Sequence, residues 1–285
     1  MYTGLCLSGG GIKGITQLGV LQRYYTENKL KNIKIGIGTS VGSIICYLLF
    51  IGYTPSEIFT EACEFDFPDL TINISSITRK FGLIDIELLL QRIEELTLKR
   101  MEYVPNLKEL YENFGKELIV VTYNLSKHVT EYLNYKSNPE LSCIDAIKLS
   151  CSIPLLFEKC VYNNNIYVDG ALSDNFPIEW LDNYINREQS DDILDDILLN
   201  GTVKDIGKNI LGINLYISDR NMNNNTIFDY VKNILVISLR KNCADSRDYL
   251  SPYIDVVTIN SDGNALDIKC GLERKIELFN IGMKI

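Results

Sequence analysis

Histidine is the scarcest chemically useful residue in this sequence, because His128 is the only one among 285 residues. A serine hydrolase triad in the usual α/β-hydrolase order would need its acid to lie between the serine and this histidine. His128 also falls in a predicted strand without a loop signal, which favours an ordinary structural position. A site that depends on histidine is therefore disfavoured. The eight cysteines are scattered, without a CxxC pair or a Cys/His spacing that suits zinc, so no metal site is predicted either.

Excess positive charge and long apolar runs are also missing. The formal net charge is −9, and no basic stripe of the kind found in nucleic-acid-binding proteins is present. The longest apolar run, Ile44–Ile51, is far shorter than the roughly 20 residues that span a bilayer, so it predicts a buried helix. The N-terminus has neither the basic start nor the apolar stretch of a secretory signal. We therefore expect a soluble, cytoplasmic, intracellular chain with reduced cysteines and no nucleic-acid partner.

Predicted strands and helices alternate along the chain, which indicates an α/β fold with a mainly parallel sheet. The length suits a single domain over residues 1–285, with the acidic stretch 187–208 as a surface insertion. The predicted strands are 2–7, 33–37, 117–123, 128–135, 159–162, 166–168, 210–217 and 254–259. The predicted helices are 15–25, 41–51, 55–63, 85–100, 142–150, 177–185, 227–239 and 272–279.

A glycine-rich turn with the pattern G-x-S-x-G follows the second predicted strand. It reads Gly38-Thr39-Ser40-Val41-Gly42 and stands directly before an apolar helix. Such a sharp turn forces the serine into a strained backbone conformation, and the two glycines let neighbouring backbone pass close by. The hydroxyl then projects at the carboxyl edge of the sheet, next to the N–H groups of a helix N-terminus. Ser40 is therefore the candidate nucleophile, although the bare pattern also arises by chance.

A serine hydroxyl needs a base to accept its proton, and the best candidate is Asp169. It follows the apolar pair Tyr167 and Val168, and Gly170 lets the chain turn at once. The carboxylate could then point at the sheet edge where Ser40 is expected. A free aspartate has a pKa of about 3.9 and is a weak base toward an alcohol, but burial raises that pKa. Asp-Gly is also a common turn pair, so position alone leaves both interpretations open.

The first predicted strand is followed by GGGIKG at residues 9–14, which fits the pattern G-x-G-x-x-G. That pattern marks a dinucleotide site when an acidic residue follows at the end of the second strand. Here residues 36–40 contain no carboxylate, and a dinucleotide site leaves Ser40 unexplained. Bare glycine amides can instead donate to the oxyanion of a tetrahedral intermediate. Lys13 could add positive charge near that oxygen or a lipid phosphate, or be an ordinary solvated lysine.

Taken together, these motifs resemble the patatin-like phospholipase family over about residues 2–180. The stretches that carry the resemblance are, in chain order, GGGIKG at 9–14, GTSVG at 38–42, SCSIP at 150–154, DGA at 169–171 and DNFP at 174–177. Cys151 and Ile153 are larger than the residues that the family usually has at these positions. The resemblance implies a three-layer α/β/α sandwich with a mainly parallel central sheet.

The same resemblance implies a lipid acyl hydrolase that uses a Ser-Asp dyad and needs no metal or organic cofactor. By position, Ser40 is the nucleophile and Asp169 the general base, while Gly10 and Gly11 are oxyanion donors with Lys13 nearby as a substrate-binding residue. The expected partner is a phospholipid or another acyl lipid, with transient peripheral contact to a membrane. Two alternatives stay open: an NAD(P)-binding Rossmann oxidoreductase, and a catalytically silent lipid-binding protein that retains the fold.

The stretch from Glu64 to Leu83 is the candidate for contact with lipid. Because the net charge is −9, attraction to an anionic membrane is not available, and docking has to depend on apolar residues. This stretch contains Phe65, Phe67, Ile72, Ile74 and Ile77, together with Arg79 and Lys80. We therefore predict that it forms a lid or a membrane-facing flap.

Overall fold

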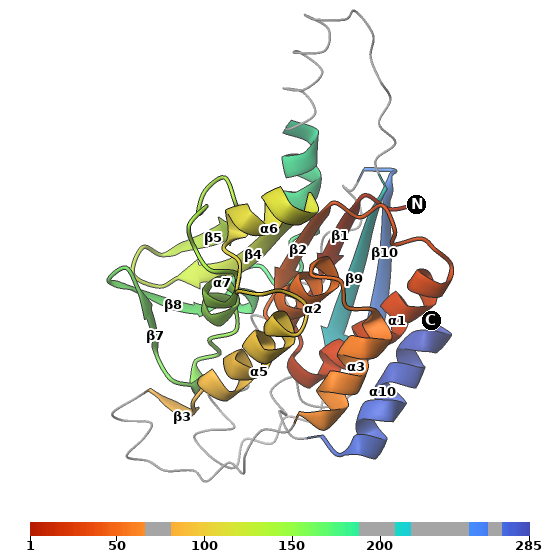
Figure 1. The fold of residues 1–285 in the computed structure, drawn as a ribbon, viewed down its shortest axis with the longest axis horizontal. Coiled ribbons are helices and arrows are strands. Elements are labelled where there is room, and N and C mark those ends of the chain that lie inside the picture. Colours follow the sequence, from red (N-terminus) through yellow and green to blue (C-terminus); the bar gives the residue numbers. More distant parts are fainter. Residues whose placement is uncertain (66–80, 188–208, 218–250, 262–269) are drawn as a thin grey trace, which may run out of the picture.

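The computed structural model describes residues 1–65, 81–187, 209–217, 251–261 and 270–285 (Figure 1). The predicted helix 227–239, nearly all of the predicted surface insertion and most of the predicted flap lie outside these residues. Within the described ranges, no helix has both the length and the apolar character that crossing a bilayer requires.

Strands and helices alternate through the first half of the chain, as the sequence predicts. The strands are β1 (Gly4–Leu7), β2 (Ile35–Thr39), β3 (Gly82–Ile84), β4 (Glu117–Asn124), β5 (Val129–Leu133), β6 (Leu155–Phe157), β7 (Cys160–Tyr162), β8 (Asn165–Asp169), β9 (Ile210–Ile217) and β10 (Ile254–Ser261). The helices are α1 (Gly14–Thr26), α2 (Val41–Phe50), α3 (Pro55–Glu64), α5 (Glu87–Leu98), α6 (Leu107–Phe114), α7 (Cys143–Ser150), one over residues 178–187, and α10 (Leu272–Lys284), with short 3-10 turns η1 (Gly11–Lys13) and η2 (Gly170–Leu172).

The main sheet has the strand order β10-β9-β1-β2-β4-β8-β7, and β5 also pairs with β4. The five strands from β10 to β4 are parallel, whereas β5, β7 and β8 are antiparallel to their neighbours. The antiparallel part arises from hairpins: Asn163 and Asn164 connect β7 to β8 with φ of 47° and 61°, a conformation that asparagine tolerates. The prediction of a mainly parallel α/β sheet is confirmed.

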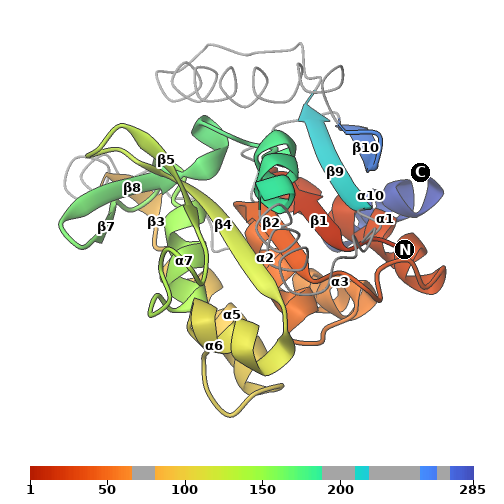
Figure 2. The same cartoon turned by 90° about the horizontal axis from the view of Figure 1, so that it is seen from above.

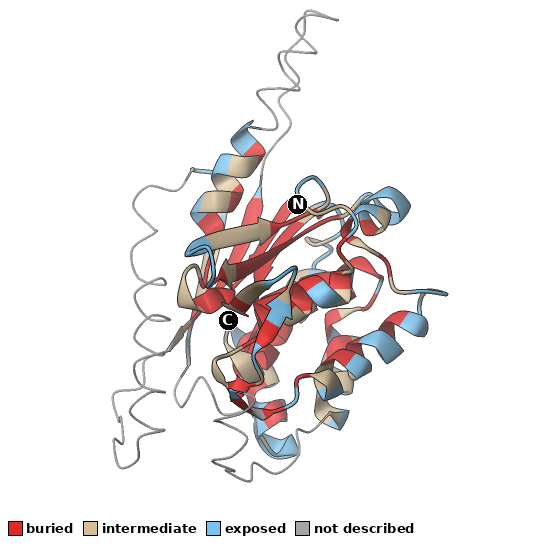
Figure 3. Cartoon of the chain, turned by 90° about the vertical axis from the view of Figure 1, so that its left-hand side faces the viewer, coloured by how far each residue is buried: buried red, intermediate tan, exposed pale blue. Residues whose placement is uncertain are grey.

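The two faces of the sheet bury different sets of residues, as alternation along a strand requires. On β4, Leu118 and Val120 belong to a core shared with α1, α2, α3, α5 and α7. Ile119 and Val121 face a second core formed with the helix over residues 178–187. Helices therefore cover both faces; Figure 2 shows the sheet between them, and Figure 3 shows that most of its strands are buried. This arrangement confirms the three-layer α/β/α sandwich.

The most consequential feature of the sheet is that β2 and β8 share one edge of β4. Thr39, the last residue of β2, lies opposite Val121, and Asp169, the last residue of β8, lies opposite Thr122. Val121 and Thr122 also pair with β5, which occupies the other edge of β4. Strands β2 and β8 must therefore lie on the same edge of β4. Since β2 runs parallel to β4 and β8 runs antiparallel, their carboxyl ends meet head to head.

Helices α1 and α10 pack closely through one glycine from each. A Cβ atom on Gly19 would lie 2.1 Å from the Phe279 carbonyl oxygen, and one on Gly282 would lie 2.1 Å from the Thr16 carbonyl oxygen. Real Cβ atoms do not approach backbone so closely, so both positions require glycine for this packing. The C-terminal helix is thereby fixed against the first helix of the fold.

Replacing Gly282 by alanine should lower the free energy of unfolding by about 1–3 kcal/mol, because the new methyl group must push α10 away from α1. Urea denaturation of the purified protein measures this change. Gly271→Ala is the matched control, because a Cβ at Gly271 meets nothing within 4 Å. An equal loss of stability in both variants would contradict the close packing of these helices.

Candidate active site

Ser40 occupies a strained turn between β2 and α2. Its φ is 52° and its ψ is −124°, a region that residues with a side chain rarely adopt. Two glycines make the turn possible: a Cβ on Gly38 would lie 2.4 Å from the Ser43 amide nitrogen, and one on Gly42 would lie 2.4 Å from the Leu7 carbonyl oxygen. The sequence therefore folds here into the sharp strand-to-helix turn that G-x-S-x-G describes.

Ser40 and Asp169, which are 129 residues apart in the chain, are hydrogen-bonded. Ser40 Oγ donates to Asp169 Oδ2 at 2.6 Å. The other carboxylate oxygen, Oδ1, accepts from the amide of Ala171 at 2.8 Å, in the turn that follows β8. Ser40 is 5% exposed and Asp169 is 3% exposed, so the pair is shielded from bulk water. The structure thus brings together the two residues that the sequence singles out as nucleophile and base.

Burial raises the pKa of Asp169 from its ordinary value of 3.8 to about 6. The hydrogen bonds from Ser40 and from the Ala171 amide act in the opposite direction, because they favour the ionised carboxylate. A carboxylate with a pKa near 6 is a stronger base than a solvated aspartate and is still ionised at neutral pH.

Ser150, at the end of α7, supports the turn and was not identified by the sequence motifs as a site residue. Its Oγ accepts a hydrogen bond from the Ser40 amide at 2.8 Å and donates to the Val121 carbonyl oxygen at 2.6 Å. The hydroxyl therefore links the Ser40 backbone to β4. The available signal was the small-residue segment 150–154, which the sequence resemblance includes without assigning a role to Ser150.

The glycine loop 9–14 passes directly beside this turn. A Cβ on Gly9 would lie 3.3 Å from Ser40 Cβ and 2.6 Å from Asn175 Oδ1, so there is little room for a side chain here. The Gly9 amide donates to the Asn175 carbonyl oxygen at 3.3 Å. In the ranges that the structure describes, the amides of Gly10 and Gly11 have no protein acceptor. They lie in a partly exposed position next to the serine turn.

A buried side-chain contact fixes the start of the same loop. Gln17 Nε2 donates to the Ser8 carbonyl oxygen at 2.8 Å and to Ser8 Oγ at 3.0 Å. Ser8 Oγ also accepts from the Leu215 amide on β9 at 2.9 Å. Sequence patterns offer little to identify Gln17, because a polar residue in an apolar helix gives no indication of its partner.

Lys13 and His128 lie in quite different surroundings. Lys13 is buried, with 4% exposure, in η1. Its role in substrate binding stays a prediction. His128 is exposed in the turn between β4 and β5, with φ of 56°, rather than inside a strand. Residues 128–135 are expected from the sequence to pair with the preceding strand. This is confirmed for β5, which pairs with β4 but begins at Val129, after His128. Among the described residues, no cluster of three His, Cys, Asp or Glu side chains is placed to hold a metal ion.

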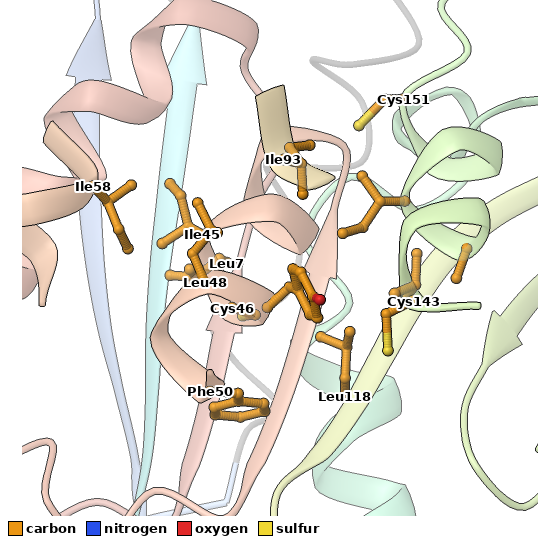
Figure 4. Close-up of a cluster of buried hydrophobic side chains, with 14 of the residues drawn as sticks. Leu7, Ile45, Cys46, Leu48, Phe50, Ile58, Ile93, Leu118, Cys143 and Cys151 are labelled. Atoms are coloured by element: carbon orange, nitrogen blue, oxygen red, sulfur yellow. The ribbon is translucent and has the colours of Figure 1, made fainter. Parts of the chain in front are cut away.

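An apolar cavity of about 170 Å³ opens next to Ser40. Its walls come from α1, α2, α3 and α5, with Gly11 and Ile12 from the glycine loop and Cys151, Ile153 and Phe157 from the segment after α7. Figure 4 shows several of the wall residues in the packed interior, among them Ile45, Leu48, Ile58, Ile93 and Cys151. The cavity offers an apolar space for a group attached to whatever reacts at Ser40.

The model of one protein family, described as patatin-like phospholipase, matches residues 5–182. The chain belongs to the patatin-like phospholipase family. The matched residues include the serine turn, the Asp169 turn and the glycine loop. The family resemblance predicted from the motifs is therefore confirmed.

Sequence relatives agree with this family assignment, and a solved structure shares the fold. The chain is 38% identical over 193 residues to the protein named "Probable lipid hydrolase 463L" of Invertebrate iridescent virus 6, covering 66% of each sequence, just under two thirds. It is 26% identical over 206 residues to the triacylglycerol lipase ptl3 of Schizosaccharomyces pombe, covering 61% of this chain and 41% of the lipase. The crystal structure of VipD from Legionella pneumophila matches with a TM-score of 0.53 at 15% identity, over 99% of this chain and 65% of VipD. The VipD match concerns the fold alone.

The raised pKa of Asp169 in this patatin-like chain predicts a stability cost at high pH. A carboxyl group that binds its proton more tightly in the folded state favours folding at low pH, and this contribution is lost as pH rises through about 6. Because one pKa unit corresponds to about 1.4 kcal/mol, ionised Asp169 costs the fold about 3 kcal/mol near pH 8. A neutral asparagine at this position does not ionise, so the variant Asp169→Asn should be the more stable protein there.

Urea denaturation of both proteins from pH 8 to pH 5 checks this expectation. The stability advantage of Asp169→Asn should narrow as the pH falls, because the native aspartate then binds its proton. Other titrating groups are the same in both proteins and cancel in the difference. A stability difference that does not change with pH would contradict the raised pKa.

Proposed function

We propose that this protein hydrolyses the acyl ester bond of a phospholipid or a related acyl lipid, through Ser40 as nucleophile and Asp169 as general base. The observation that carries the proposal is the hydrogen bond from Ser40 Oγ to Asp169 Oδ2 at 2.6 Å between two buried residues. A hydroxyl that already donates to a basic carboxylate is poised to transfer its proton as it attacks a carbonyl carbon.

In the first half of the reaction, Ser40 Oγ attacks the ester carbonyl carbon while its proton passes to Asp169 Oδ2. The amides of Gly10 and Gly11 donate to the oxyanion that forms, and each such donor is worth about 3 kcal/mol in comparable sites. The tetrahedral intermediate collapses to an acyl-enzyme on Ser40, and the leaving alcohol takes the proton from Asp169.

In the second half, water attacks the acyl-enzyme and gives its proton to Asp169. The resulting intermediate collapses to release the fatty acid, and Ser40 Oγ regains its proton from the carboxyl group. Residues Ser150 and Gln17 take no part in these proton transfers. They hold the Ser40 backbone and the glycine loop in place through the hydrogen bonds described above.

The cavity beside Ser40 supports an acyl substrate in particular. Its walls are almost entirely apolar, which suits an alkyl chain better than the phosphates and ribose of a nucleotide. The names of two relatives, a viral "Probable lipid hydrolase" and a fission yeast triacylglycerol lipase, also support a lipid substrate. These observations favour an acyl hydrolase over an NAD(P)-dependent oxidoreductase.

Ser40→Ala and Asp169→Asn should each lower the turnover of a p-nitrophenyl acyl ester by at least about 10³-fold, because each removes one half of the proton-transfer pair. Initial rates measured on purified proteins give this number. The matched controls are Ser56→Ala and Asp145→Asn, which change exposed residues of α3 and α7. Both controls should retain full activity. Wild-type rates in either site variant would defeat the proposal, and an inactive wild-type protein would favour a silent lipid-binding role.

The pH dependence of hydrolysis should follow the ionisation of Asp169. The carboxyl group accepts a proton only when ionised, and its pKa is raised to about 6. We therefore expect kcat/KM to fall about tenfold for each pH unit below about pH 6 and to level off above pH 7. A rate profile for a soluble ester between pH 4.5 and pH 8 measures the midpoint. A midpoint near the ordinary aspartate value of 3.8 would contradict the assignment of the base.

A further inference from the structure

Two charged side chains interrupt the apolar wall of the cavity. Glu61 of α3 and Arg92 of α5 both line it, and the other described wall residues carry no charge. Arg92 Nη2 contacts Glu61 Oε2 at 2.6 Å, so the two residues join α3 to α5 across the cavity. We refer to this contact as the Glu61–Arg92 bridge.

The bridge is one of the partly exposed parts of the cavity wall. The side chains of Glu61 and Arg92 are 19% and 25% exposed, and other wall residues, such as Ile44 and Leu89, are partly exposed as well. Neighbouring charges hold the bridge in place: Arg92 also contacts Glu95 at 2.9 Å, and Lys99 contacts Glu61 at 3.2 Å. Helix α3 packs mainly against α1 rather than against α5. On this side, the space between α3 and α5 is therefore closed by charged side chains.

The cavity is small compared with a membrane lipid chain. An engineered cavity of about 150 Å³ takes up one benzene molecule, and the cavity here is about 170 Å³. A hexanoyl group contains as many carbon atoms as benzene and can be accommodated. A palmitoyl group is far longer, so its distal carbons must leave the cavity, and on the side between α3 and α5 their path is occupied by the bridge.

We infer that the Glu61–Arg92 bridge limits the length of the acyl chain that the cavity accepts, and that the intact bridge favours esters of short acyl chains. This inference rests on the proposed function. A long chain must either separate the two charges or place its methylene groups against them and exclude their water, and both are unfavourable. A short chain ends before the bridge and leaves it undisturbed.

The bridge is not placed to bind a lipid phosphate. Arg92 is surrounded by three carboxylates, those of Glu61, Glu64 and Glu95, and these more than balance its charge. A phosphate at this position would be repelled by the carboxylates. The contribution of the bridge to specificity is therefore to restrict the chain rather than to recognise a headgroup.

The test compares p-nitrophenyl hexanoate with p-nitrophenyl palmitate, each in the same detergent micelles, with wild-type protein and the double variant Glu61→Gln/Arg92→Gln. The double variant removes both charges; Glu61→Gln keeps the size of the side chain, whereas Arg92→Gln also shortens it. We expect the ratio of kcat/KM for palmitate over hexanoate to rise at least about tenfold, the discrimination that a hydrophobic pocket typically provides. The single variant Glu61→Gln should give a smaller rise in this ratio. It provides the test if the double variant does not fold.

Arg100→Gln is the matched control. Arg100 contacts Glu57 at 2.6 Å and also links α3 to the end of α5, but neither residue lines the cavity. The control should leave the palmitate-to-hexanoate ratio within twofold of wild type. An unchanged ratio in the folded double variant, or an equal rise in Arg100→Gln, would overturn the inference.

A binding measurement separates this inference from the proposed function. Hexanol and dodecanol have no ester bond, so their binding to Ser40→Ala protein, measured by calorimetry, does not depend on catalysis. Adding Glu61→Gln/Arg92→Gln should tighten dodecanol binding at least about tenfold and change hexanol binding less than twofold. If neither ester is hydrolysed, the proposed function fails, but the binding result still decides whether the bridge limits chain length. Equal changes in the binding of both alcohols would refute the inference about the bridge.

Discussion

The site depends on the way in which two strands end on one edge of β4. Strand β2 runs parallel to β4 and delivers Thr39 opposite Val121, while β8 runs antiparallel and delivers Asp169 opposite Thr122. The next residue after β2 is Ser40, so a hydroxyl and a carboxylate from distant parts of the sequence meet at 2.6 Å. Backbone pairing in the sheet, rather than a flexible loop, sets this distance.

The same arrangement is costly to the fold. Ser40 has a backbone conformation of a kind that costs about 1–3 kcal/mol, and Asp169 ionises in a buried environment that disfavours charge. Close packing elsewhere must offset these costs, as at the contact of α1 with α10, where Gly19 and Gly282 let the two backbones meet. A strained serine turn beside a buried carboxylate, within a well-packed sandwich, is the pattern expected of a reactive site.

Local patterns were enough to predict much of this structure. The GTSVG turn and the Asp169 turn could be identified because strained turns need particular residues, and the β7–β8 hairpin because Asn163 and Asn164 tolerate positive φ. Helix α6 was missed although Asn106 and Glu109 form a capping box at its start. Strands β3 and β6 were missed because three-residue strands gain their stability from each other across the fold.

The features that sequence patterns could not predict depend on contacts between distant segments. No sequence pattern indicates that Ser150 accepts from the Ser40 amide, or that Gln17 holds the glycine loop, because each contact needs the completed sheet. The cavity and the bridge from Glu61 to Arg92 also arise only when α3 and α5 face each other. In sequence both residues resemble ordinary charged positions on amphipathic helices.

Covalent labelling with a fluorophosphonate tests most directly whether the buried contact between Ser40 and Asp169 creates a nucleophile. The probe forms a bond with a serine oxygen only when that oxygen is activated, and peptide mass spectrometry locates the adduct. Our account predicts a single adduct on Ser40 in the wild-type protein and at least about a hundredfold slower labelling in Asp169→Asn. Labelling at another serine, or equal labelling rates in both proteins, would contradict it.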